Sequence, residues 1–207
     1  MGSENPSSAV NQQGSLLVAT GMTPQRLHAE LLASSQHDLD QYLLGSMCDS
    51  TFNRWHGTIR FCQKNRNWLV VLKEILSLLG HNAWIYREGK DRQLWVCETK
   101  TFRPQTQAGN SLSYVRGFFD SDGGMPRMKN ARLYFQFTQK SFEDISNLKL
   151  IMENHGIECG SPHVPSKQVD PDYWRLFVRA QSHKNFIHCV GSWHPRKRVL
   201  MHYRMKI

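Results

Sequence analysis

The chain carries one structural pattern twice. Leu43–Phe52 and Tyr114–Gly124 are both apolar, contain a glycine and end in small, polar and acidic residues. Each is followed by an alternating strand pattern, 58–64 and 132–140, and both strands stop at Gln-Lys. A capped helix pattern and further strand segments come next in each copy. The order helix, strands, helix, strands therefore occurs twice, which predicts a duplicated unit.

The spacing between matched positions grows along the chain, from Gly45 and Gly117, through Gln63 and Gln139, to Val96 and Val178. Loops tolerate added length, so insertions that accumulate between elements are what divergent duplication produces. The pattern predicts an α+β fold of two tandem αββαββα-type repeats. We place a flexible tail at residues 1–21, the first repeat at 22–100, a polar linker at 101–111 and the second repeat at 112–207.

The second motif places Asp120 and Asp122 at the end of a helix. A helix C-terminus carries partial negative charge, so each carboxylate there costs about 0.3 to 1 kcal/mol unless a cation offsets it. A metal site is one interpretation, and a simple helix-ending turn is the other. A calcium loop fits poorly, because Met125 and Ala131 stand where such a loop needs Gly and Glu.

The formal net charge of +9 favours a polyanionic partner, most simply nucleic acid, although a basic surface also serves solubility or membranes. From Tyr173 to Ile207 the chain has no Asp or Glu. Five cysteines without a Cys-x-x-Cys spacing indicate free thiols in a reducing compartment. With neither a signal-peptide pattern nor a membrane span, we expect an intracellular protein, in a bacterial cytoplasm or an organelle.

Two segments together resemble a known family. Val115–Gly123 and Leu133–Lys140 are similar to the motif and the first DNA-facing strand of single-chain, two-repeat LAGLIDADG homing endonucleases. The likeness runs from about Asp38 to the C-terminus. It implies a monomer with internal pseudo-twofold symmetry, a saddle of antiparallel sheets, and paired motif helices that approach closely at Gly45 and Gly117.

The resemblance also implies a divalent-metal-dependent endonuclease for double-stranded DNA. The acid that binds the metal in this family corresponds to Asp122 in the second repeat, and Asp120 is expected to be structural. In the first repeat the corresponding position holds Ser50, and Asp49 stands one position before it. Asp49 and Asp122 are thus the expected ligands of Mg²⁺, for which Mn²⁺ substitutes. The remaining candidate catalytic residues are Gln63 and Gln139, whose alternative role is turn formation, and Lys100.

Strand alternation places polar and basic side chains on one face of each sheet, where they can read base edges in a major groove. The candidate DNA-binding residues include Arg54, Arg60, Arg132, Tyr134, Gln136, Arg175 and Arg179. Lys184, Arg196 and Lys197 are candidates for binding phosphates without reading the sequence. Exposed arginines on a solvated sheet are the plain alternative. Because of Ser50, three outcomes stay open: cleavage of both strands, nicking, or binding alone, as in an intron RNA maturase or a DNA-binding regulator. An unrelated basic protein-interaction module is a further alternative.

Overall fold

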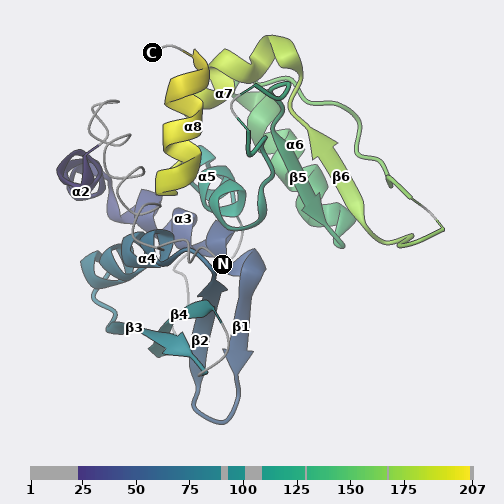
Figure 1. The fold of residues 1–207 in the computed structure, drawn as a ribbon. Coiled ribbons are helices and arrows are strands. Elements are labelled where there is room, and N and C mark those ends of the chain that lie inside the picture. The colour runs from purple at the N-terminus through teal and green to yellow at the C-terminus, as the bar shows by residue number, and fades with distance from the viewer. Residues whose placement is uncertain (1–22, 90–92, 101–108, 129, 167, 206–207) are drawn as a thin grey trace, which may run out of the picture.

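The computed structural model describes residues 23–89, 93–100, 109–128, 130–166 and 168–205. The tail expected at 1–21 and most of the expected linker, 101–108, lie outside these residues. In the described part the chain is a mixture of helices and antiparallel sheets, which confirms the predicted α+β class (Figure 1). None of the described helices is long and apolar enough to cross a membrane.

The first half begins with two helices and continues into a sheet. The helices are α2 (Pro24–Ala33) and α3 (Gln36–Ser46), and α3 continues as a 3₁₀ turn, η1 (Met47–Asp49). The strands are β1 (Ser50–Asn53), β2 (Thr58–Gln63), β3 (Ala83–Glu88) and β4 (Leu94–Lys100), paired antiparallel in the order β1-β2-β4-β3. Between β2 and β3 runs α4 (Arg66–Leu78), which Asn65 caps by accepting a hydrogen bond from the Asn67 N–H.

The second half repeats this order with a shorter sheet. Its elements are α5 (Leu112–Asp122), β5 (Gln136–Gln139), α6 (Phe142–Asn154), β6 (Trp174–Phe177), η2 (Ala180–Ser182), α7 (His183–Cys189) and α8 (Pro195–Met205). The positions that match β1 and β3 are reduced to isolated bridges, which join Gly124 to Gln136, Cys159 to Val178 and His163 to Arg175. A strand was expected over 132–140, but the observed strand β5 covers only Gln136–Gln139. One further hydrogen bond precedes it, from the Val178 N–H to the Phe135 carbonyl.

Each half has its own apolar core, and α3 and α5 cross between them (Figure 1). In the first core, α4 places Trp68 and Leu72 against Ile59 and Phe61 of β2. In the second, Phe135 and Phe137 pack against Phe119 of α5 and Phe186 of α7. Trp193, from the far end of the chain, joins the first core, with its ring centroid 4.6 Å from that of Tyr42. The two halves thus form one packed body.

Candidate functional site

The crossing of α3 and α5 depends on two glycines. A Cβ on Gly45 would lie 2.1 Å from the Tyr114 carbonyl oxygen, and one on Gly117 would lie 2.0 Å from the Tyr42 carbonyl oxygen. The obstacle in both cases is backbone, which cannot swing aside as a side chain does. The structure therefore places both glycines at the helix interface that the family resemblance implied, and each allows the other helix to approach closely.

This crossing brings the ends of the two motif helices together. Cys48 and Ser121, the residues before Asp49 and Asp122, are in contact, with Sγ and Oγ 3.0 Å apart. Both aspartates are exposed at this end of the helix pair. Partial burial and the charge of Asp49 raise the pKa of Asp122 to about 6. Two carboxylates that oppose each other's ionisation in this way form a place where a cation is favoured.

A 3₁₀ turn explains how Asp49 takes a position that the sequence assigned to Ser50. The helix tightens over Met47–Asp49, and the Ser50 hydroxyl donates to the Met47 carbonyl at 2.8 Å. Ser50 thereby closes the helix and starts β1, while Asp49 becomes the last helical residue, as Asp122 is in α5. The one-position offset in the sequence is absorbed by the local backbone.

The two glutamines differ in their surroundings. The Gln63 amide donates to an Asp49 carboxylate oxygen at 2.8 Å, which fixes the orientation of that acid. Burial raises the pKa of Asp49, and this hydrogen bond opposes the rise because it favours the charged form. The Gln139 amide oxygen accepts from the Lys140 backbone N–H at 2.8 Å, the turn-forming arrangement that was the alternative for both residues.

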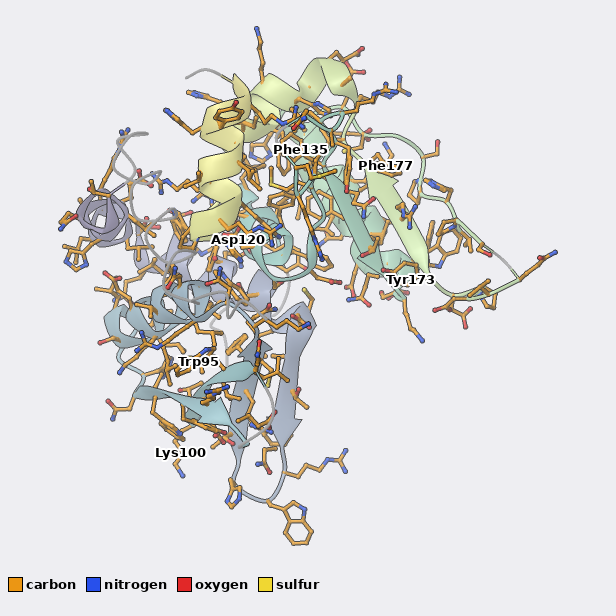
Figure 2. All side chains as sticks on the ribbon, viewed as in Figure 1. Trp95, Lys100, Asp120, Phe135, Tyr173 and Phe177 are labelled. Atoms are coloured by element: carbon orange, nitrogen blue, oxygen red, sulfur yellow. The ribbon has the colours of Figure 1, made fainter. Side chains whose placement is uncertain are left out.

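Lys100 does not fit the catalytic position expected of it. In the β2–β4 ladder Lys100 lies opposite Thr58, whereas Gln63, which reaches Asp49, lies opposite Trp95. Five residues of strand therefore separate Lys100 from the acid pair, about 16 Å at the usual rise per residue. Figure 2 shows Lys100 at the end of the first sheet that is remote from Asp120. Counting residues along the sequence could not detect this, because the strand's direction decides which end faces the helices.

A different lysine lies at the acid pair. The Lys197 ammonium donates to the Phe119 carbonyl, to that of Asp120 at 3.2 Å and to that of Gly123 at 2.7 Å. The Asp120 and Gly123 carbonyls lie at the end of α5, where a helix leaves carbonyls without intrahelical partners, and the Phe119 carbonyl also accepts from the Gly123 N–H at 2.9 Å. Burial lowers the pKa of Lys197 to about 8, and the nearby Asp120 and Asp122 oppose that shift. Lys197 is thus an internal cation at the helix end, not the phosphate contact that the sequence predicted.

Asp120 anchors the C-terminal segment to both motif helices. This buried carboxylate accepts from the Tyr42 hydroxyl at 2.8 Å and from the backbone N–H groups of Trp193 at 2.7 Å and His194 at 2.9 Å. The Ser192 hydroxyl donates to it as well. Burial raises the pKa of Asp120, against the effect of Lys197 and these donors. Its position agrees with the structural role that the resemblance implied.

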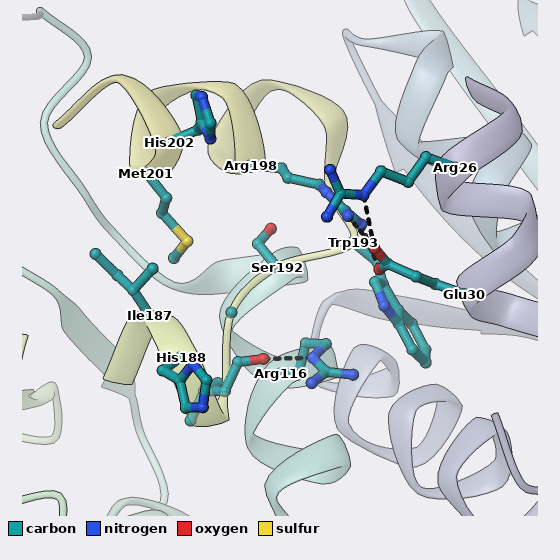
Figure 3. A pocket seen from close by; sticks show the side chains of 12 residues that line it. Arg26, Glu30, Arg116, Ile187, His188, Ser192, Trp193, Arg198, Met201 and His202 are labelled. Carbon is teal, nitrogen blue, oxygen red and sulfur yellow. Dashed lines mark hydrogen bonds and ion pairs between the residues drawn. The ribbon is translucent and has the colours of Figure 1, made fainter. Parts of the chain in front are cut away.

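The basic C-terminal run is used largely inside the protein. Arg198 makes a two-point ion pair with Glu30 that joins α8 to α2, and Arg204 donates to the Ala131 carbonyl. Figure 3 shows Arg198 and Arg26 meeting Glu30 beside a hollow of about 330 Å³, with Arg116 bonded to the Val190 carbonyl on its other side. Arg196 remains exposed at the start of α8. The segment has no acids, but several of its basic side chains are used in contacts within the protein. Fewer positive charges are therefore available to phosphates than the sequence suggests.

The open face of the first sheet is less basic than predicted. Arg60 donates to Glu88 at 2.6 Å, an ion pair that raises the pKa of Arg60 above its ordinary value. Beside it, buried Glu98 accepts from the Thr58 hydroxyl at 2.5 Å and from the Tyr86 hydroxyl at 2.6 Å. Arg60 is therefore already paired with an acid on this face. Arg54 is exposed in the turn between β1 and β2.

The second sheet keeps the predicted alternation. Leu176 and Val178 are buried, as are Phe135 and Phe137, and the residues between them form the open face or its margin. The candidates there are Arg132, Tyr134, Gln136, Arg175 and Arg179, of which Arg179 also donates to the Cys159 carbonyl at 3.1 Å. Lys184 does not share this face. It lies on α7, which packs against the opposite side of the sheet through Phe186.

The donor set at the helix ends suits a hard cation that brings other ligands with it. Among the described residues no group of three or more His, Cys, Asp or Glu side chains is arranged to hold a metal ion. Mg²⁺ is commonly bound by one or two carboxylates while waters and phosphate oxygens complete its shell. Asp49 and Asp122, exposed and mutually repelling, match that requirement.

Comparison of the sequence with family models and with curated proteins finds no match. Solved structures do match. The structure of I-DmoI with DNA and Mn has a TM-score of 0.55 at 11% identity, over 76% of this chain and 98% of that one. The structure of I-DmoI with DNA and Ca has a TM-score of 0.54 at 11% identity, over 75% of this chain and 90% of that one. The chain has the LAGLIDADG fold.

The N-terminal LAGLIDADG domain of DUF199/WhiA is similar too, with a TM-score of 0.59 at 12% identity, over 80% of this chain and 88% of that domain. The LAGLIDADG fold therefore joins this chain to a homing endonuclease bound to DNA and to a second kind of protein. Because a fold hosts more than one function, activity must be argued from the site itself.

Proposed function

We propose that the protein is a divalent-metal-dependent endonuclease that cuts double-stranded DNA at a specific site. The observation that carries the proposal is the pair of exposed carboxylates, Asp49 and Asp122, contributed by different halves at the ends of two crossing helices. DNA-bound structures of I-DmoI on the same fold contain Mn or Ca, which supports a divalent ion here.

Each residue at the site has a definite task in this proposal. Asp49 and Asp122 hold Mg²⁺, which when bound stabilises developing charge on a phosphate and favours ionisation of a water. Gln63 keeps the Asp49 carboxylate in one orientation through its 2.8 Å hydrogen bond. Lys197 holds the last turn of α5, and with it Asp122, by binding the Phe119 and Gly123 carbonyls. Buried Asp120 secures the segment that supplies Lys197.

The duplex would lie on the open faces of the two sheets. Arg132, Gln136 and Arg175 supply the contacts from the second half, and Arg54 supplies one from the first. Such side chains combine phosphate neutralisation by arginine with hydrogen bonds to base edges. The ion pair between Arg60 and Glu88 makes the first half the weaker contributor.

The test begins with duplexes selected from a randomised pool by binding to the protein in Ca²⁺. These duplexes are then incubated with the protein in Mg²⁺ or Mn²⁺. Wild-type protein should cut them, and Asp122→Asn and Asp49→Asn should each lose at least about 100-fold in rate. Asp172→Asn, a change in an exposed acid on the loop before β6, is the matched control and should cut normally. Cutting that persists in the Asp49 and Asp122 double variant would refute the assignment.

A non-catalytic nucleic-acid binder, such as an intron RNA maturase or a DNA-binding regulator, is the second candidate. Two observations favour it: Lys100 lies far from the acid pair, and Glu88 and Glu98 occupy the open face of the first sheet. This candidate predicts salt-dependent binding of the selected duplexes with both strands intact in Mg²⁺ and in Mn²⁺. Separation of the strands on a denaturing gel distinguishes cleavage of both strands, nicking and binding alone.

A further inference from the structure

The open face of β5–β6 carries a cluster of rings. Phe177 lies at its centre. The Tyr134 ring meets it edge-on, with the ring centroids 6.3 Å apart, and the His163 ring is stacked on it, with the centroids 6.0 Å apart. Tyr134 is 36% exposed, and His163 is exposed as well. These rings stand on the side of the sheet opposite Phe135 and Phe137, so the buried core does not account for them.

A hollow of about 370 Å³ lies beside these rings. Its walls include Tyr134 and Phe177, the polar residues Arg132 and Gln136, and the apolar Leu133 and Val178. The volume falls within the range of about 300 to 1,000 Å³ that is usual for small-ligand pockets. An aromatic lining with a few polar groups at its margin suits a flat, partly apolar ring that also carries hydrogen-bonding edges.

Arg175 lies over the Phe177 ring on the same face of the sheet, although it does not line the hollow. Its guanidinium carbon lies 5.9 Å from the centre of the Phe177 ring, and its Nε is buried without a hydrogen-bond acceptor in the described part of the chain.

These features match an unpaired nucleobase better than an intact duplex. In a duplex the faces of the bases are stacked on one another, and only their edges are presented in the grooves. An unpaired base exposes its face, which stacks on aromatic side chains, while its edge remains free for hydrogen bonds. We propose that the hollow beside Tyr134 and Phe177 binds an unpaired nucleobase of a single-stranded or locally opened nucleic acid.

In this arrangement the base lies against Tyr134 and Phe177, and the Gln136 amide reads its edge. Arg132, exposed at the rim, neutralises the neighbouring phosphate. The site goes beyond the proposed cleavage of duplex DNA and does not use Asp49 or Asp122. Single-stranded DNA and RNA offer the same base face, so the source of the base is decided by comparing the two.

The experiment measures binding by fluorescence anisotropy with three labelled probes of one sequence: single-stranded DNA, single-stranded RNA and duplex DNA. Tyr134→Ala and Phe177→Ala should each weaken binding of the better single strand by roughly 5- to 150-fold, with a much smaller effect on the duplex. Tyr134→Phe should retain wild-type affinity because it keeps the ring. Tyr203→Ala is the matched control, since Tyr203 is a 49% exposed aromatic on α8, away from this sheet.

Several results would overturn the proposal. Unchanged single-strand affinity in both alanine variants would do so, as would equal losses for single strand and duplex, or a loss as large in Tyr203→Ala. If an alanine variant fails to fold by circular dichroism, wild-type protein with 2-aminopurine at one position of the strand provides the second measurement. Quenching of an unpaired 2-aminopurine supports the site, and unquenched fluorescence at saturation opposes it. Wild-type protein that binds single strands but no duplex would uphold this site while refuting the proposed endonuclease.

Discussion

Replacing either crossing glycine with alanine tests whether the α3–α5 contact is as close as the structure shows. In an isolated helix, Gly→Ala stabilises by about 1 kcal/mol. Here the new Cβ would lie 2.1 Å from the Tyr114 carbonyl oxygen at Gly45, or 2.0 Å from that of Tyr42 at Gly117, whereas ordinary contacts begin near 3.4 Å. The helices must separate by more than 1 Å to make room for the Cβ. Alanine should therefore destabilise the protein at these positions instead of stabilising it.

The cost should be near the upper end of the range for overpacking, about 3 kcal/mol, because backbone and not a flexible side chain is in the way. For a chain of this size each kcal/mol shifts the melting temperature by about 2 to 4 °C, so a fall of roughly 6 to 12 °C is expected by circular dichroism. Displacing Asp49 from Asp122 by about 1 Å should also reduce any cleavage rate by about 100-fold.

Gly160→Ala is the matched control, because a Cβ there meets only the Phe177 carbonyl oxygen at 3.7 Å. Its melting temperature should stay close to that of wild type. The Gly45 and Gly117 double variant should cost less than the sum of the single variants, since one separation of the helices relieves both clashes. A Gly45→Ala protein that melts at or above the wild-type temperature would refute the close crossing.

Three further predictions concern the residues around the helix ends. Asp120→Asn should lower the free energy of unfolding in urea by roughly 2 to 4 kcal/mol, because the donors of Tyr42, Trp193 and His194 exchange a charged acceptor for a weaker, neutral amide oxygen. Asp122→Asn should not lower it, because the raised pKa of Asp122 shows that its charge is disfavoured in the folded protein. Equal losses of stability in the two variants would contradict this assignment. Lys197→Met should destabilise the protein by about 1 to 3 kcal/mol, because the charged hydrogen bonds to the carbonyls at the end of α5 are lost. Arg196→Met changes the exposed neighbouring residue and should alter stability by no more than about 0.5 kcal/mol. The opposite ranking of the two variants would count against an internal role for Lys197. Burial, reinforced by the charges of Lys197 and Arg196, lowers the pKa of His194 to about 3 in the folded protein, from a value near 6.5 in the unfolded chain. Between these pH values only the unfolded chain takes up the proton. The free energy of unfolding should therefore decline as the pH falls from about 6.5 towards 3. His194→Asn, which keeps an acceptor for the Arg196 N–H, should show a shallower decline in urea titrations, and parallel curves would rule out this histidine as a cause.

Local patterns in the sequence were sufficient for the fold class and for most helices. The capped helix expected in each copy is present, with Asn65 immediately before α4 and Ser141 immediately before α6, because caps depend on hydrogen bonds that span only two or three residues. The repeated order of elements was readable from apolar periodicity, and the family resemblance implied that Gly45 and Gly117 lie at the helix interface, where the structure has them.

Tertiary structure decided which charges belong to the site. Lys197 follows Phe119 by 78 positions in the chain, yet binds its carbonyl, and no periodic pattern encodes such a contact. Lys100 was misplaced because the direction of β4 carries it away from the helix ends. Arg60 and Arg198 have acidic partners, Glu88 and Glu30, that are remote in sequence. Composition and spacing determine how many charges a chain has and which local elements carry them, whereas the crossing of helices and the pairing of strands determine which charges meet, because those contacts join residues that the chain itself keeps far apart.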